Sequence, residues 1–247
     1  MKNQYITILA VALFSAFTFT SCDKDDDEMQ CTNPEDNTKS VMLEFEFEMG
    51  DAPFEYNTVY DFNGVNVQFS DLRFYVSDIM LHDDAANMEM IDGAVLVDAG
   101  ASSNIFTIGE TEFEHVHELH MSIGLNEVVN HEDPILAEAP LNDASMHWGW
   151  DPASGYKFIK TEVLVDLDDD GIPETATSIH CATDGLKRDV MLDAHQDVEG
   201  DHAHLLLKAD IADIYAGVDF LNLTGTFGNT DLTNAVADNL ADAIEIE

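Results

Sequence analysis

The sequence has 247 residues, 45% of them hydrophobic, which is enough for one sizeable core. It contains 9 Lys and Arg against 50 Asp and Glu, and its formal net charge is −41. Because nucleic acids and anionic lipids both attract positive charge, this composition excludes a nucleic-acid-binding protein and electrostatic docking to a membrane. Solubility, cation binding and attraction to a basic partner remain.

The N-terminus predicts export. Residues 1–21 contain Lys2 and an apolar stretch too short to span a bilayer, as in a signal peptide. The segment ends in Ser21-Cys22, which resembles a bacterial lipobox, so we expect Cys22 to be lipidated and to anchor the chain to the outer membrane, facing the periplasm or the cell surface. An ordinary secretory peptide is the alternative. Residues 22–39 are strongly acidic and predict a disordered tether.

Two further cysteines, Cys31 and Cys181, follow the lipobox. Export permits a disulfide between them, but the sequence cannot establish their proximity. Cys31 lies in the predicted tether, and we expect no obligatory bridge.

Residues 40–247 predict one all-β domain. Hydrophobic and polar residues alternate in several short segments, the first of which is the half-buried strand Val41–Glu48. Asn63-Gly64 indicates a turn, and Ser70-Asp71 a bulge within the strand that follows it. The expected later strands cover 65–69, 72–76, 94–97, 113–123, 157–167, 177–181, 190–192 and 202–209.

Helical patterns are few. Residues 211–216 predict a turn, and apolar residues recur at every fourth position from Leu232 to Ile244, behind Thr230 or Asp231 as N-cap. Many strands and one late helix predict an antiparallel β-sandwich with a short C-terminal helix.

Both tryptophans of the chain, Trp148 and Trp150, lie in one segment that continues to Gly155-Tyr156-Lys157-Phe158. In an extended chain they share a face, and His147 points to the other side. Ordinary core packing of aromatic side chains would explain this density as well.

Ten histidines in so acidic a chain raise the question of a metal site, because neutral imidazole binds copper and zinc. His115 and His117 share one face of a predicted strand and could chelate one ion, or they could lie at its exposed end. His202 and His204 repeat this spacing in what we interpret as a solvated acidic region. His131 falls in a predicted loop, and His180 at the end of a strand.

Asp166, Asp168 and Asp170, followed by Gly171, have the spacing of a calcium-binding loop. The twelfth position is Thr177, where an EF-hand has a bidentate glutamate. The segment therefore predicts either a partial calcium site or an ordinary acidic turn.

The sequence resembles the MbnP family, copper-binding proteins named for methanobactin gene clusters. The resemblance covers residues 40 to the end, and its most specific part is Trp148-Gly149-Trp150 with Gly155-Tyr156-Lys157-Phe158. The supporting segments are 43–47, 72–79, Asn130-His131, Pro140-Leu141, Ile179-His180 before Asp184-Gly185, and Asn239-Leu240.

The resemblance implies a β-sandwich that binds one copper ion, with His131 and His180 as ligands and with His115 and His117 in reserve. It also implies that Trp148 or Trp150 can be oxidised to kynurenine by a partner di-haem enzyme of the MauG type. We therefore expect a non-enzymatic protein that captures, stores or delivers copper at the cell envelope. Copper is the main ion that we expect it to bind, and calcium is the second.

Two other functions stay open. Trp148, Trp150 and Tyr156 could form a sugar-stacking platform in a glycan-binding or adhesion domain with calcium at 166–170. His147-Trp148-Gly149 is also similar to a strand of α-type carbonic anhydrases, but Ser145 stands where that zinc site needs a histidine.

Overall fold

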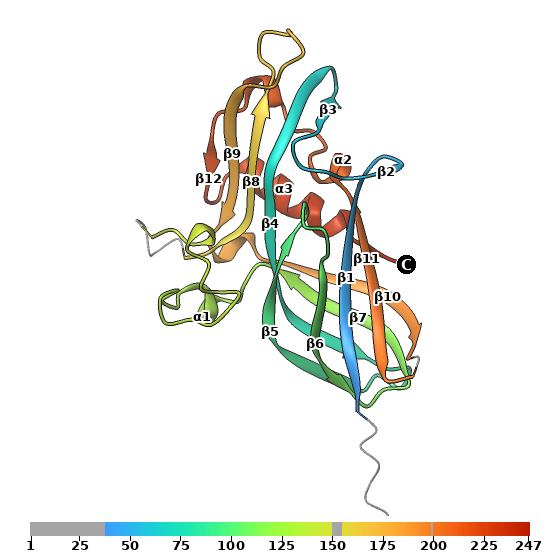
Figure 1. The fold of residues 1–247 in the computed structure, drawn as a ribbon. Coiled ribbons are helices and arrows are strands. Elements are labelled where there is room, and N and C mark those ends of the chain that lie inside the picture. The colour runs from blue at the N-terminus through green and yellow to red at the C-terminus, as the bar shows by residue number, and fades with distance from the viewer. Residues whose placement is uncertain (1–37, 150–154, 199) are drawn as a thin grey trace, which may run out of the picture. The chain divides into compact units, whose positions relative to one another are not determined.

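The computed structural model describes residues 38–149, 155–198 and 200–247 (Figure 1). Over these residues the chain forms two β-sheets with few helices, so the predicted β-sandwich is confirmed. The signal peptide, Cys22, Cys31, Trp150 and all but the last two residues of the predicted tether lie outside the described residues.

In the part of the chain that is described, the smaller sheet has five strands in the order β13-β11-β1-β2, with β6 also paired to β1. Its central strands β1 and β11 run parallel, with Leu43 opposite Leu205, which differs from the antiparallel arrangement that the sequence predicted. The bounds are β1 Lys39–Met49, β2 Ala52–Pro53, β6 Ile105–Thr111, β11 His202–Asp210 and β13 Glu245–Ile246.

The larger sheet has eight strands within the described residues, in the order β10-β7-β4-β8-β9-β12, and β3 and β5 also pair with β4. The strand β4 is long, and its register shifts between Phe69 and Asp71, where a bulge was predicted. The bounds are β3 Val59–Phe62, β4 Val65–His82, β5 Met88–Asp98, β7 His115–Ile123, β8 Lys157–Val165, β9 Thr175–Ala182, β10 Arg188–Asp197 and β12 Thr226–Phe227.

The core lies between the two sheets. The alternation in β1 buries Val41, Leu43, Phe45 and Phe47 and leaves the glutamates between them accessible. The ring of Phe74 on β4 packs edge-to-face against Phe45 at 6.1 Å and Phe47 at 6.0 Å between ring centroids. These aromatic contacts join the inner faces of the two sheets.

The longest helix of the described residues is α3, Asp231–Ala243, which confirms the predicted C-terminal helix. Thr230 is its N-cap and forms a capping box with Thr233, and Val236 and Leu240 are buried. The other helical segments are short: α1 Glu127–Asn130, α2 Ile211–Ile214, and the 3-10 turns η1 Ala144–Met146, η2 Asp184–Leu186 and η3 Phe220–Asn222. Among the described residues, no helix has the length and apolar composition needed to cross a membrane.

Candidate metal sites

Three groups of His, Asp and Glu side chains in the described residues have metal-ligand atoms within 4.8 Å of one another. Two of them lie at the end of the larger sheet where β4 ends and β7 begins, and the third lies in the loop after β8. The three groups are Asp84, His115 and His117; His82, Glu118 and His120; and Asp166, Asp168 and Asp170.

The first group joins the turn after β4 to the first residues of β7. The Nδ1 atom of His115 lies 3.1 Å from one carboxylate oxygen of Asp84, and Nδ1 of His117 lies 3.2 Å from the other. Both Nδ1 atoms are buried, and neither has a hydrogen-bond partner of good geometry among the described residues. Both Nδ1 atoms therefore lie close to the same carboxylate, and neither makes a well-formed hydrogen bond.

A third imidazole approaches this group from β10. The ring of His195 lies 4.4 Å from that of His117 and 6.2 Å from that of His115, between centroids. The pairing of β10 with β7 shifts register between Asp193 and Gln196, and His195 has a left-handed φ of 46°. A bulge of this kind redirects a side chain, and here it turns His195 toward His117.

The donor set of Asp84, His115 and His117 fits a borderline divalent ion. Imidazole and carboxylate suit copper and zinc, and the general order of affinity places Cu²⁺ above Zn²⁺. The side chain of Asp84 is 69% exposed and those of His115 and His117 are 25% and 36% exposed, so the group lies at the surface with its two Nδ1 atoms covered.

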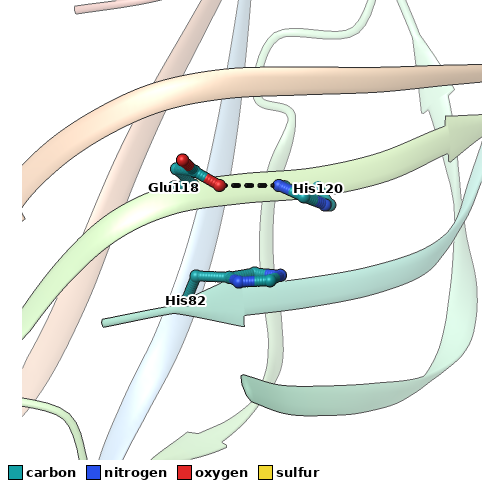
Figure 2. A group of neighbouring side chains, drawn as sticks. All are labelled: His82, Glu118 and His120. Carbon is teal, nitrogen blue, oxygen red and sulfur yellow. Dashed lines mark hydrogen bonds and ion pairs between the residues drawn. The ribbon is translucent and has the colours of Figure 1, made fainter. Parts of the chain in front are cut away.

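The second group lies on the outer face of the larger sheet (Figure 2). The rings of His82 on β4 and His120 on β7 stack with centroids 4.3 Å apart. Nε2 of His120 lies 2.9 Å from a carboxylate oxygen of Glu118, and this contact lowers the pKa of Glu118. The Nε2 atom of His82 is buried and has no hydrogen-bond partner among the described residues.

In the third group, Asp166 already holds its own loop closed. Its carboxylate accepts hydrogen bonds from the backbone N–H of Gly171 at 2.8 Å and of Asp170 at 3.3 Å, and from the Asn66 side chain at 3.1 Å. These hydrogen bonds, with that of Asn66 the largest cause, lower the pKa of Asp166. Asp166 therefore closes the turn through hydrogen bonds within the protein.

The predicted ligand His180 lies beside Trp148. Their ring centroids are 5.6 Å apart, and Phe227 packs on His180 at 5.1 Å. Nε2 of His180 lies 2.8 Å from a carboxylate oxygen of Glu162, while Nδ1 is buried without a hydrogen-bond partner in the described part of the chain. Burial lowers the pKa of His180 despite the opposing effect of Glu162, which favours the neutral imidazole that a metal ligand requires.

The other predicted ligand, His131, is held by a different carboxylate. Its Nε2 atom lies 3.1 Å from Asp184, which also accepts a hydrogen bond from Asn130 at 2.7 Å. Burial alone would raise the pKa of Asp184, but these two contacts outweigh it and lower the pKa. His131 and His147 line one pocket of about 340 Å³ in front of the tryptophan segment.

Contacts with Arg73 and Lys157 hold the chain around Trp148 in place. Arg73 donates to Asp143 at 2.8 Å and to Ser145 at 2.9 Å, just before Trp148. The ammonium group of Lys157 lies 5.0 Å from the Trp148 ring centroid, and Trp148 is only 7% exposed. Its indole is thus packed in the fold between cationic and aromatic side chains.

Of the predicted ligands, the structure brings His115 and His117 together and places His180 against Trp148. None of the three groups within the described residues includes His131 or His180. Four further residues in or beside these groups were not predicted as ligands from the sequence: Asp84, His195, His82 and His120. Asp84 lies in a turn and His195 in a bulge, and only the pairing of β4, β7 and β10 brings them to the His115–His117 pair.

The fold and these sites define a β-sandwich protein with histidine-rich metal-site candidates. The model of the MbnP family matches residues 38–233, and the chain therefore belongs to the MbnP family of methanobactin-associated proteins. A solved structure, MbnP from Methylosinus trichosporium, is similar with a TM-score of 0.57 at 16% identity, over 76% of this chain and 81% of that chain. At this identity the likeness shows the fold alone. A search of curated proteins found no match.

Proposed function

We propose that this chain is a copper-binding protein and that Asp84, His115 and His117 hold the ion. The observation that carries the proposal is the convergence of two buried Nδ1 atoms on one carboxylate, at 3.1 and 3.2 Å. The ring of His195, 4.4 Å from that of His117 between centroids, is a candidate for a third imidazole. The proposed role is capture, storage or delivery of copper rather than catalysis.

The family resemblance favours His131 and His180 instead, and one observation supports His180. Its Nε2 contact with Glu162 orients the ring and leaves the buried Nδ1 beside Trp148 as the free donor, as in many carboxylate–histidine–metal sites. His131 and His180 are each paired through Nε2 with their own carboxylate, so a shared ion would have to bind their Nδ1 atoms, and no group of ligand atoms within 4.8 Å among the described residues contains both.

A competition titration of Cu²⁺ against a chromophoric chelator tests the proposal. We expect one tightly bound ion in the wild type and a loss of at least about a hundredfold in affinity in His115→Ala/His117→Ala. His202→Ala/His204→Ala is the matched control, because it removes a pair of the same spacing whose members contact two different carboxylates, Asp201 and Glu44, and do not share one. Loss only in His131→Ala/His180→Ala would move the site to the tryptophan segment, and a preference for Zn²⁺ over Cu²⁺ would contradict copper as the cargo.

Envelope anchoring and tryptophan oxidation belong to the same proposal. The Ser21-Cys22 motif supports lipidation of Cys22, and Cys22→Ala should move the chain from the membrane fraction to the soluble fraction. Trp148 and Trp150 are the candidates for kynurenine, and the contact of Trp148 with His180 favours Trp148. Intact mass after co-expression with a MauG-type enzyme, compared between wild type and Trp148→Phe, tests this modification.

A further inference from the structure

The outer face of the larger sheet carries a row of methionines around His120. Met80 on β4 pairs with Met90 on β5 and with His120 on β7, and His120 pairs in turn with Met191 on β10. Directly opposite residues in paired strands project to the same face, with Cβ atoms roughly 5 Å apart. Four neighbouring strands therefore present three thioethers and one imidazole in a transverse row.

A second row lies two residues along each strand. His82 on β4 pairs with Met88 on β5 and with Glu118 on β7. Figure 2 shows the His82 ring lying alongside that of His120, with Glu118 hydrogen-bonded to His120. The methionine–histidine face consists of Met80, His82, Met88, Met90, His120 and Met191.

Packing does not account for these methionines. Met88, Met90 and Met191 are 64%, 70% and 66% exposed, whereas the alternate positions Ile79, Leu81 and Leu119 fill the core. In a half-buried strand the outward positions are ordinarily polar, because an apolar side chain that stays in water does not contribute hydrophobic free energy to folding. Single exposed apolar residues are common on protein surfaces. Here, however, several exposed methionines surround two imidazoles, so thioether sulfur and imidazole nitrogen, both possible metal ligands, lie on one face.

We propose that the methionine–histidine face binds a soft monovalent cation, Cu(I), through His82, His120 and the thioether of Met80, with Met90 or Met191 beside them. Thioether sulfur selects Cu(I) among the biological metals, and imidazole is a compatible second donor. The Nε2 atom of His82 is buried without a hydrogen-bond partner among the described residues. Glu118 engages Nε2 of His120, which orients that ring and leaves its Nδ1 as the donor.

This site is separate from the one proposed above. The two groups share no residue. The donors that we propose here are the thioether of Met80, which is opposite His120, and the two imidazoles, instead of a carboxylate and two imidazoles. It predicts a different preferred ion and therefore does not depend on copper binding at Asp84.

The test is a titration of the chain with Ag(I), a redox-inert probe for Cu(I), observed by NMR of 13C-labelled methionine methyl groups. Cys22→Ser and Cys31→Ser remove the thiols outside the described residues, while Cys181 is buried and burial raises its pKa to about 12. We expect the methyl signal of Met80, and of Met90 or Met191, to shift with one equivalent. Met49 on β1 in the other sheet is the internal control and should not shift.

Affinity measurements on variants complete the test. Met80→Leu/Met90→Leu/Met191→Leu keeps the side-chain volume and should weaken Ag(I) binding at least tenfold, as should His82→Asn/His120→Asn. Met49→Leu and His115→Ala/His117→Ala should bind Ag(I) like the wild type. Equal shifts of all exposed methionines, or wild-type affinity in the Met→Leu variant, would overturn the proposal whatever the result for Cu²⁺ at Asp84.

Discussion

The carboxylate of Asp84 lies 3.2 Å from Nδ1 of His117, although the two residues belong to a turn after β4 and to the start of β7. The β4–β7 pairing, in which His82 is opposite Glu118, brings the turn to the start of β7. In a chain of net charge −41, most carboxylates repel one another in solvent, and this one instead faces two imidazoles. The arrangement is the physical basis for the proposed copper site.

The first prediction concerns Asp84 itself. Asp84→Asn keeps the shape of the side chain but removes its charge and one oxygen donor, so we expect Cu²⁺ affinity to fall by about tenfold or more. The chelator competition titration measures this loss. Asp83→Asn is a poor control because Asp83 caps the same turn through Ala85 and Asn87. Asp92→Asn on β5 is suitable, and wild-type affinity in Asp84→Asn would show that its carboxylate is not a ligand.

The second prediction is a pH dependence of stability that arises from His180. Because burial lowers the pKa of His180 in the folded protein below the ordinary histidine value of 6.5, the unfolded chain takes up the proton first as the pH falls. The contribution to the free energy of unfolding is complete above about 6.5 and is lost as the pH decreases from there toward the folded pKa. Denaturant unfolding of the metal-free protein at pH 7 and pH 5 should show a smaller decrease in His180→Asn than in the wild type. An equal decrease would contradict a neutral buried His180.

The third prediction tests how the tryptophan segment is held. Gly155 has φ +65°, and an added Cβ would lie 2.3 Å from the carbonyl oxygen of Asn130. The side-chain oxygen of Asn130 accepts a hydrogen bond from the N–H of Tyr156 at 2.8 Å. Because the added Cβ would displace Asn130, Gly155→Ala should also break this hydrogen bond. We expect a loss of more than about 1 kcal/mol in the free energy of unfolding and a change in tryptophan fluorescence.

Gly50→Ala is the matched control for this substitution. Gly50 has a similar φ of +63° but no neighbour within 4 Å of the added Cβ, so it isolates the cost of backbone strain from that of the clash. If the two variants lost the same stability, the close approach of Asn130 to Gly155 would not be important.

The fourth prediction concerns the acidic loop at 166–170. Asp166→Ala should lower the melting temperature even in the presence of a calcium chelator, because the lost hydrogen bonds to Gly171 and Asn66 are internal. Asp168→Ala, at an exposed position of the same loop, should leave the melting temperature unchanged in chelator. Thermal unfolding with and without calcium measures both, and an effect of Asp166→Ala only when calcium is present would show that the ion holds the loop.

The sequence could predict those features that depend on local spacing. The alternation of hydrophobic and polar residues predicted the strands β1 and β7. The N-cap at Thr230 and the apolar periodicity of the residues after it predicted α3. The same spacing placed His115 and His117 on one face. The parallel pairing of β1 with β11 was not predictable, because it joins strands far apart in the chain and no local signal fixes their partner.

The donors that complete the sites depend on register between strands. Met80 and Met191 flank His120 only because β4 and β10 pair with β7 in one particular register. His195 reaches His117 because of a bulge with a left-handed residue, for which its neighbours in sequence give no turn signal. The copper ligands that the family resemblance implied, His131 and His180, remain predictions.

Electron paramagnetic resonance of the chain with one equivalent of Cu²⁺, after uniform 15N labelling of histidine, tests the copper site most directly. We expect hyperfine coupling to at least two imidazole nitrogens in the wild type and in His131→Ala/His180→Ala, and its loss in His115→Ala/His117→Ala. A spectrum that is unchanged in His115→Ala/His117→Ala and lost in His131→Ala/His180→Ala would contradict the proposed copper site.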